Sequence, residues 1–130
     1  MYNFKKLEIW GEAMEIVTEI YQLTSDLPVN ENFGLKSQTR RAAVSVPSNI
    51  AEGNSRNSDK ENNRFIEIAI GSSNELITLI LIGKNLDFYK QKQIDPVINR
   101  LEKLQRRLYT SKKRLTANSL QLTANRRMRK

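Results

Sequence analysis

Four stretches of this chain repeat apolar residues at steps of three and four, the spacing that places side chains on one face of an α-helix. The four sets are Trp10, Ala13, Met14, Val17, Ile20 and Tyr21; Leu35, Thr39, Ala42, Val46 and Ile50; Phe65, Ile68, Ala69, Ser72, Leu76, Leu79, Ile80 and Gly83; and Ile94, Val97, Leu101, Leu104, Leu108, Ser111 and Leu115. The pattern predicts four amphipathic helices.

Prolines and polar clusters separate the first two predicted helices. The first should end near Asp26–Leu27, because Pro28 disfavours helical geometry at the preceding residue. The second is predicted to open at Asn30–Asn32 and to end near Gly53–Asn54, where a glycine can adopt a left-handed conformation.

The last two predicted helices carry start signals. Ser58 and Glu61 form the capping-box pattern, so the third helix should begin there and run to Phe88 or Tyr89. Asp95-Pro96 reads as an N-cap followed by proline at the first helical position, and the fourth helix is predicted to open at this pair.

Four helices with short links predict an all-α fold, an antiparallel up-down four-helix bundle over residues 1–115. Residues 116–130 form a basic tail containing the repeat Leu-Thr-Ala-Asn. Because threonine and asparagine are weak helix formers, the tail is expected to fray unless a partner orders it.

The third predicted helix has more apolar surface than one bundle face requires. A second apolar face carries Ile66, Ile70, Ile77 and Leu81. Surplus apolar surface of this kind marks interfaces, so we expect a self-association surface and a homo-oligomer. The alternative is that the tail or the first helix covers this surface within one chain.

The absence of cysteine and histidine excludes several kinds of chemistry. The usual zinc sites, the Ser-His-Asp relay and the histidine-containing di-iron site of helix bundles all require residues that this chain lacks. The five glycines are isolated and form no phosphate-binding loop. We therefore expect no enzyme activity, no catalytic residue, no metal and no cofactor.

The hydrophobic segments suggest a cytoplasmic protein. The start of the sequence has no signal-peptide pattern, and the longest apolar run, Leu76–Ile82, is much shorter than a membrane span. No membrane association through a spanning helix is expected.

Positive charge is concentrated at the carboxyl end. Residues 1–102 carry a net charge of −2, whereas residues 103–130 contain ten basic and no acidic residues, which gives the chain its formal +8. The candidate nucleic-acid-binding residues are Lys103, Arg106, Arg107, Lys112, Lys113, Arg114, Arg126, Arg127, Arg129 and Lys130. RNA or DNA is the first candidate partner and an anionic membrane the second, while a solvated helix face without a partner is the alternative.

The second helix contains an unusual segment, Gln38 to Gly53, with Pro47 in its interior. An interior proline cannot donate to the carbonyl of Ala43 and costs about 3 kcal/mol, so a kink is predicted. Ser45, Ser48 and Asn49 surround the proline and could bond carbonyl groups that it leaves open.

This segment resembles the family of four-helix-bundle proteins first noticed as reading frames within intervening sequences of 23S ribosomal RNA. The motifs that carry the resemblance are Phe4…Leu7…Trp10…Ala13, Glu31–Leu35, Gln38…Arg40-Arg41-Ala-Ala, Ser45-Val-Pro-Ser-Asn-Ile-Ala-Glu-Gly53, and Arg64-Phe65…Ala69-Ile-Gly-Ser72…Glu75-Leu76. The likeness extends from residue 4 to near residue 110 and does not include the tail.

The resemblance implies a ring-like homopentamer with a central channel and no catalytic residues. It also implies a distant relation to the accessory variability proteins of diversity-generating retroelements, which bind a reverse transcriptase and its RNA template. The family motif supplies further candidate residues, which are either structural or binding: Arg40, Arg41, Ser45, Pro47, Asn49, Glu52 and Gly53.

Two of these groups have competing interpretations. Arg40 and Arg41 could hold phosphate, or one of them could pair with Glu52, Glu67 or Glu75 between helices. Asn49 and Glu52 could bind a small ligand, or they could satisfy backbone groups at the kink.

The sequence thus predicts a non-catalytic homo-oligomeric bundle that binds nucleic acid, most readily RNA, through its basic carboxyl-terminal region. The alternative is a scaffold for a protein partner such as a reverse transcriptase, with no direct role in nucleic-acid binding.

Overall fold

The computed structural model describes residues 7–129, and every regular element in that range is helical. Helix α1 spans Glu8–Thr24, the 3-10 turn η2 spans Val29–Glu31, α2 spans Leu35–Asn54, α3 spans Asp59–Asn85 and α4 spans Gln91–Met128. The predicted all-α fold is confirmed for these residues.

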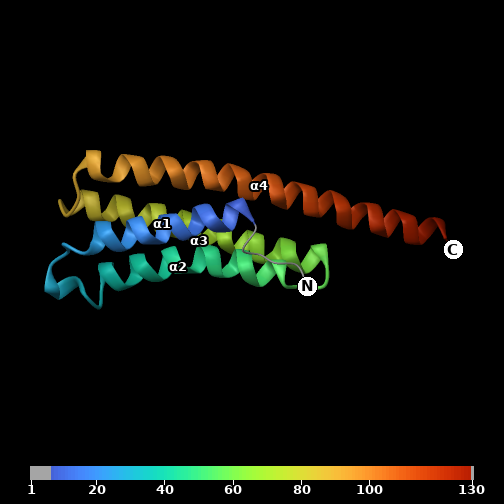
Figure 1. The fold of residues 1–130 in the computed structure, drawn as a ribbon, viewed down its shortest axis with the longest axis horizontal. Coiled ribbons are helices and arrows are strands. Elements are labelled where there is room, and N and C mark those ends of the chain that lie inside the picture. The colour runs from blue at the N-terminus through green and yellow to red at the C-terminus, as the bar shows by residue number, and fades with distance from the viewer. Residues whose placement is uncertain (1–6, 130) are drawn as a thin grey trace.

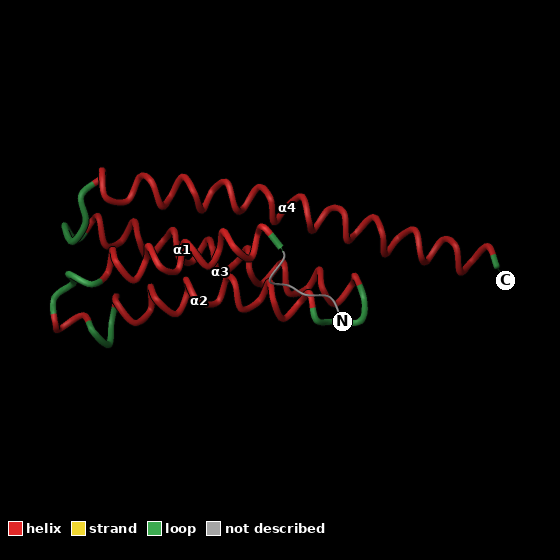
Figure 2. The backbone as a smooth tube through the Cα atoms, in the orientation of Figure 1, coloured by secondary structure: helices red, strands yellow, loops and turns green. Residues whose placement is uncertain are grey.

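The four long helices pack around one shared core. Consecutive helices contact each other, and α4 also contacts α1, which closes the bundle (Figure 1). Short loops join the helices, as the trace in Figure 2 shows. The fully buried large side chains of this core are Ile20, Ile50, Leu76, Ile80, Ile94, Leu101, Leu104 and Leu108. The apolar stripe of α4 therefore packs inward as its heptad spacing predicts.

Helix α4 begins earlier than the sequence signals indicate. The predicted start at Asp95-Pro96 is wrong, because Pro96 lies inside a helix that begins at Gln91. The backbone N–H of Lys90 donates to Gln93 Oε1 at 2.8 Å, which caps the actual start. A proline in the second turn removes only one helical hydrogen bond, and packing of the fully buried Ile94 outweighs that loss.

Helix α3 begins as predicted and ends sooner. The Ser58 hydroxyl accepts from the Glu61 backbone N–H at 3.1 Å, which confirms the cap. The predicted continuation to Phe88 or Tyr89 is wrong, because the helix ends at Asn85. Asp87 adopts a left-handed conformation with φ of 63°, and the backbone N–H of Phe88 donates to the Gly83 carbonyl as the chain turns away.

Gly53 has a packing role in place of the predicted left-handed one. Asp87 is the only position with positive φ among the described residues. A Cβ on Gly53 would lie 2.7 Å from the Cβ of Phe65 and 2.8 Å from Asn62 Oδ1. The glycine therefore permits α2 and α3 to approach closely, while Phe65 itself is only partly buried and is not in the core.

The inner face of α3 is largely the predicted one, with Ala69, Ser72, Leu76, Leu79, Ile80 and Gly83 buried, but it also takes in residues of the second apolar face. Ile66 and Ile70 are 3% and 6% exposed, whereas Ile68, expected to face the core, is 42% exposed. Because α3 is apolar almost all round, its periodicity does not define one direction. Leu81 and Ile82 each remain 41% exposed, so apolar surface is left uncovered within one chain.

Helix α3 is the one described helix long and apolar enough to cross a membrane, with a mean hydropathy of 1.7 over its most apolar window. The core helix of a soluble protein meets the same criterion. Within the bundle, 44% of that window is buried. Composition alone is therefore weak support for a membrane span.

Candidate nucleic-acid interface

Helix α4 continues beyond the bundle as a projecting segment (Figure 1). Leu115 is its last buried residue, and nearly all side chains of residues 116–129 are exposed. At a rise of 1.5 Å per residue, the segment from residue 116 to residue 128 is about 20 Å long. We call these residues the α4 extension. They are helical in the structure, and their fraying in solution stays a prediction.

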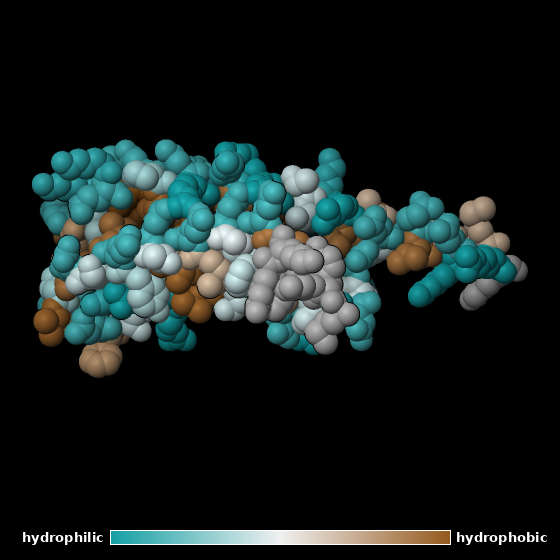
Figure 3. Space-filling model, viewed as in Figure 1, coloured by the Kyte–Doolittle hydropathy of each residue, from teal (hydrophilic) through white to brown (hydrophobic). Residues whose placement is uncertain are grey.

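Most of the predicted nucleic-acid-binding cations are free to meet a partner. Seven of them are exposed and make no ion pair within the described residues: Lys103, Arg106, Lys113, Arg114, Arg126, Arg127 and Arg129. Lys130 lies outside the described residues. Figure 3 shows the α4 extension as a mainly hydrophilic surface with a few hydrophobic residues. An unpaired cation keeps its charge available for phosphate.

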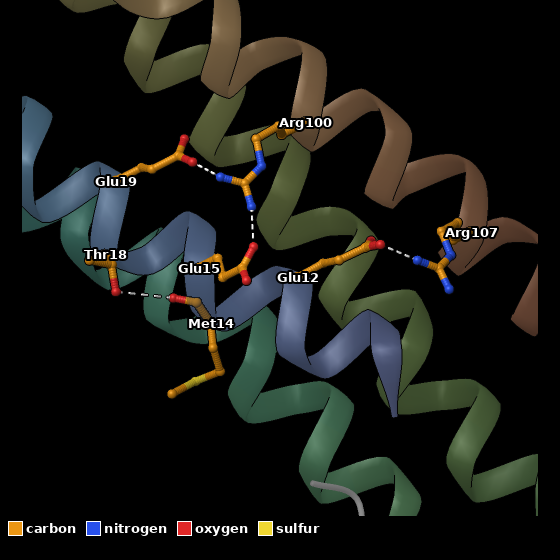
Figure 4. Close-up of polar contacts among 7 residues, drawn as sticks. All are labelled: Glu12, Met14, Glu15, Thr18, Glu19, Arg100 and Arg107. Atoms are coloured by element: carbon orange, nitrogen blue, oxygen red, sulfur yellow. Dashed lines mark hydrogen bonds and ion pairs between the residues drawn. The ribbon is translucent and has the colours of Figure 1, made fainter. Parts of the chain in front are cut away.

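Arg107 is bound to α1. Its guanidinium donates to Glu8 Oε2 at 2.7 Å. It also pairs with Glu12 (Figure 4). The hydrogen bond to Glu8 raises the pKa of Arg107, so the side chain stays charged and paired. Lys112 lies 3.7 Å from Glu67 on α3, which also neutralises part of its charge.

A second arginine makes the same kind of contact along the α1–α4 seam. Arg100 donates to Glu15 Oε2 at 2.5 Å and pairs with Glu19 (Figure 4). This residue was not among the predicted site residues. Its sequence signal is the combination of two arginines seven residues apart on α4 with four glutamates at helical steps on α1.

Arg40 joins α2 to the end of α1. Its Nε donates to Thr24 Oγ1 at 2.9 Å, its Nη2 donates to the Tyr21 carbonyl at 3.1 Å, and its guanidinium lies 4.2 Å from the centre of the Tyr21 ring. The predicted pairing with Glu52, Glu67 or Glu75 is wrong for Arg40. Its partners are instead the Thr24 hydroxyl and the Tyr21 carbonyl, near the negative end of the α1 dipole. Arg41 is exposed.

The residues around Pro47 make hydrogen bonds between α2 and α3 and within α2. Ser45 Oγ and Ser72 Oγ share a hydrogen bond of 2.7 Å between α2 and α3. Asn49 Nδ2 donates to the Ser45 carbonyl at 2.8 Å, whereas the carbonyl that Pro47 leaves open is that of Ala43, so the role expected for Asn49 at the kink stays a prediction. Helix α2 is unbroken through the buried Pro47, and a bend there stays a prediction.

Glu52 takes no part in that network. It pairs with Arg56 one turn later, on an exposed surface. Exposed pairs at this spacing contribute only about 0.3–0.5 kcal/mol. The geometry therefore gives Glu52 a local role within α2 and its following turn.

The comparisons with known proteins identify the family. Residues 5–110 match the family described as 23S rRNA-intervening sequence protein. The chain belongs to this family. A search of curated proteins found no match.

A solved structure shares the fold of this family member. It is the crystal structure of a protein of unknown function from the S23 ribosomal protein family of Bacteroides thetaiotaomicron VPI-5482, 18% identical, with a TM-score of 0.73. The alignment covers 81% of this chain and 98% of that one. At this identity the likeness supports the four-helix fold alone.

The family match divides the candidate interface. Lys103, Arg106 and Arg107 lie within the matched residues, whereas Lys112 and every later cation lie beyond residue 110. The α4 extension is thus an addition to the part of the chain that defines the family. The family match therefore gives no information about the positive charge of the extension.

The described residues contain no cluster of three or more acidic side chains that could hold a metal ion. Tyr89 has a shifted pKa, but it is not part of the α4 surface. Its side chain is buried in the bundle, and this burial raises its pKa to about 12. The candidate site is thus described by the exposed charges of α4.

A second basic surface, not predicted from the sequence, lies at the α1–α2 connection. A hollow of about 660 Å³ is lined by Tyr21, Phe33, Lys36, Arg40 and Arg41, among others. The Phe33 side chain is 99% exposed. The sequence signal was weak, because these residues come from two helices and the turn between them and are contiguous only in the folded chain.

Proposed function

We propose that this family member is a non-catalytic, homo-oligomeric four-helix bundle that binds RNA through the cations of α4. The observation that carries the proposal is the row of exposed, unpaired cations on a projecting helix. No acidic residue follows Glu102, so nothing on the extension neutralises them. Phosphate contacts of this kind supply sequence-independent affinity for nucleic acid.

The proposed topology is antiparallel and up-down. The α1–α4 ion pairs support it, because Arg100 pairs with Glu15 and Glu19 whereas the later Arg107 pairs with Glu8 and Glu12. The hydrogen bond from Gln105 on α4 to Asn74 and that between Asn63 and Thr116 give the same order for α3 and α4.

Self-association forms the second part of the proposal. Ile68, Leu81 and Ile82 are each more than two-fifths exposed on α3, and exposed apolar residues of this kind favour an interface. The family resemblance favours a ring-like pentamer. Five α4 extensions on one particle would strengthen weak phosphate contacts through multivalency. We propose that the assembly acts in the cytoplasm.

A protein scaffold is the second candidate function. Leu120, Leu122 and Met128 are 67%, 54% and 84% exposed on the α4 extension. Apolar side chains on a basic helix suit an acidic protein groove as well as a polyanion. In that case the extension would bind a polymerase-like partner and RNA affinity would be weak.

The test compares RNA binding by two variants with equal charge loss. One carries Arg126→Gln, Arg127→Gln and Arg129→Gln on the α4 extension. The control carries Lys60→Gln, Arg64→Gln and Lys92→Gln, which are exposed cations of the bundle. Fluorescence anisotropy with labelled single-stranded RNA should show a large loss of affinity for the first variant and a small one for the control. Equal losses would contradict the proposed role of the extension.

Sedimentation equilibrium on the same proteins tests the oligomer. We expect a mass of several chains for all three proteins, because none of the substitutions removes an apolar side chain of α3. A monomer at micromolar concentration would contradict self-association.

A further inference from the structure

The hollow at the α1–α2 connection combines exposed aromatic rings with unneutralised cations. Lys36, Arg40 and Arg41 line it, and none of the three pairs with a carboxylate within the described residues. Phe33 and Tyr21, which are 99% and 42% exposed, lie on the same lining. Proteins that bind single-stranded nucleic acid combine a positive groove with aromatic side chains on which bases stack.

We propose that this hollow is a second RNA site, which holds an unpaired single-stranded segment. The Phe33 ring is free on both faces and offers a stacking surface for a base. Lys36 and Arg41 lie beside it and would meet the flanking phosphates. The proposal rests on the proposed RNA-binding function and adds a site that the α4 extension does not include.

Local contacts hold the lining in place before any ligand arrives. Arg40 is fixed by its bonds to Thr24 and to the Tyr21 carbonyl, and its guanidinium is stacked on the Tyr21 ring. Glu31 accepts from the Leu35 backbone N–H at 3.0 Å, which holds the turn that presents Phe33. The backbone that presents Phe33 and the Arg40 side chain therefore lose little conformational entropy on binding.

The position of the hollow suggests how one RNA would use both basic surfaces. The α1–α2 connection lies at the opposite end of the bundle from the α4 extension (Figure 1). The two surfaces therefore contact different parts of a strand. Because the hollow lacks an acidic lining residue, its positive charge favours a polyanion as the occupant.

The test uses full-length protein and a labelled oligouridine of about 12 nucleotides, within the site sizes of single-strand binders. Phe33→Leu and the pair Lys36→Gln with Arg41→Gln remove stacking and charge separately. Val29→Ser is the matched control, because Val29 is 82% exposed on the same connection and does not line the hollow. Lys60→Gln combined with Lys92→Gln is the control for the loss of two charges, because both lysines are exposed away from the hollow.

We expect Phe33→Leu to weaken binding roughly tenfold, the size of one lost base–aromatic stack. The charge pair should weaken it and reduce its salt dependence, whereas the two controls should leave it within twofold. Ultraviolet crosslinking of the oligouridine followed by mass spectrometry should place a crosslink on Phe33 or Tyr21.

Two outcomes would overturn the second site while leaving the proposed function intact. One is RNA binding that is lost with the arginines of the α4 extension and unaffected by Phe33→Leu. The other is a change of oligomeric mass with Phe33→Leu at constant RNA affinity per chain, which would make Phe33 a contact between copies. Absence of RNA binding by the unaltered protein would instead overturn the proposed function itself.

Discussion

Two glycines in the helices of this bundle should respond in opposite directions to the same substitution. A Cβ at Gly71 on α3 would have no neighbour within 4 Å, whereas one at Gly53 on α2 would meet the Cβ of Phe65 at 2.7 Å and the Asn62 carbonyl at 3.1 Å. Alanine lowers the entropy of the unfolded chain in both cases and favours helix. Only at Gly53 does it also force two helices apart.

The magnitudes follow from those distances. Gly71→Ala should raise the free energy of unfolding by about 0.5–1 kcal/mol, the propensity difference between glycine and alanine. Gly53→Ala gains less near its helix end and incurs an overpacking cost of about 1–3 kcal/mol, for a net loss of about 1–2 kcal/mol. At about 4 °C per kcal/mol, the two melting temperatures should differ by about 8 °C.

Thermal and urea unfolding followed by circular dichroism measures both changes. Sedimentation on each variant verifies that the oligomer is unchanged, so that the comparison is between equal assemblies. Shifts in the same direction for both variants, or a Gly53→Ala protein more stable than the parent, would refute the close approach of α2 and α3.

Three further predictions concern single side chains. Arg107→Gln should lower the free energy of unfolding slightly, by less than about 1 kcal/mol, and leave RNA affinity unchanged. Arg106 makes no ion pair within the described residues, so Arg106→Gln should weaken RNA binding and leave stability unchanged. Equal loss of RNA affinity in both variants would contradict the assigned pairing. Ser58→Ala should cost about 1 kcal/mol in urea unfolding, and Ser58→Asp should retain the cap; a parent-like Ser58→Ala protein would argue against the cap. Burial raises the pKa of Tyr89 from 10.0 to about 12. The free energy of unfolding should therefore be unaffected by this phenol below pH 10 and should fall as the pH rises from 10 towards 12, because the unfolded chain loses the proton first. Tyr89→Phe removes a buried hydroxyl that has no partner and should be at least as stable as the parent near neutral pH, with a smaller alkaline loss; an identical alkaline profile would contradict the burial effect.

The sequence predicted the elements of this fold better than their ends and faces. The stripe of α4 was correct because a strict three-four alternation admits one inward direction. The face of α3 was largely correct and was wrong at Phe65 and Ile68, because the apolar residues extend onto a second face and only tertiary packing selects Ile66 and Ile70 over Ile68. The start of α4 was wrong because the Asp95-Pro96 signal is local, while burial of Ile94 is not.

The candidate site shows the same division. The order of charged residues in the sequence shows the excess positive charge at the carboxyl end. The structure adds which of these cations make no ion pair among the residues that it describes. The pairing of Arg107 with α1 depends on residues almost one hundred positions away, so sequence order conceals it. The hollow beside Phe33 was missed for a similar reason, because Tyr21 and Arg41 meet only when α1 and α2 pack together.

The measurement that tests the account most directly is the salt dependence of RNA binding by the full chain. It is compared with the variant that lacks the charges of Arg126, Arg127 and Arg129. For single-stranded RNA, the log–log slope should be about −0.7 for each phosphate contact, so the variant should lose about 2 from the slope per bound chain. That result would establish the α4 extension as a phosphate-binding element. Identical slopes, or no salt-dependent binding by the full chain, would contradict the central claim and favour a protein partner.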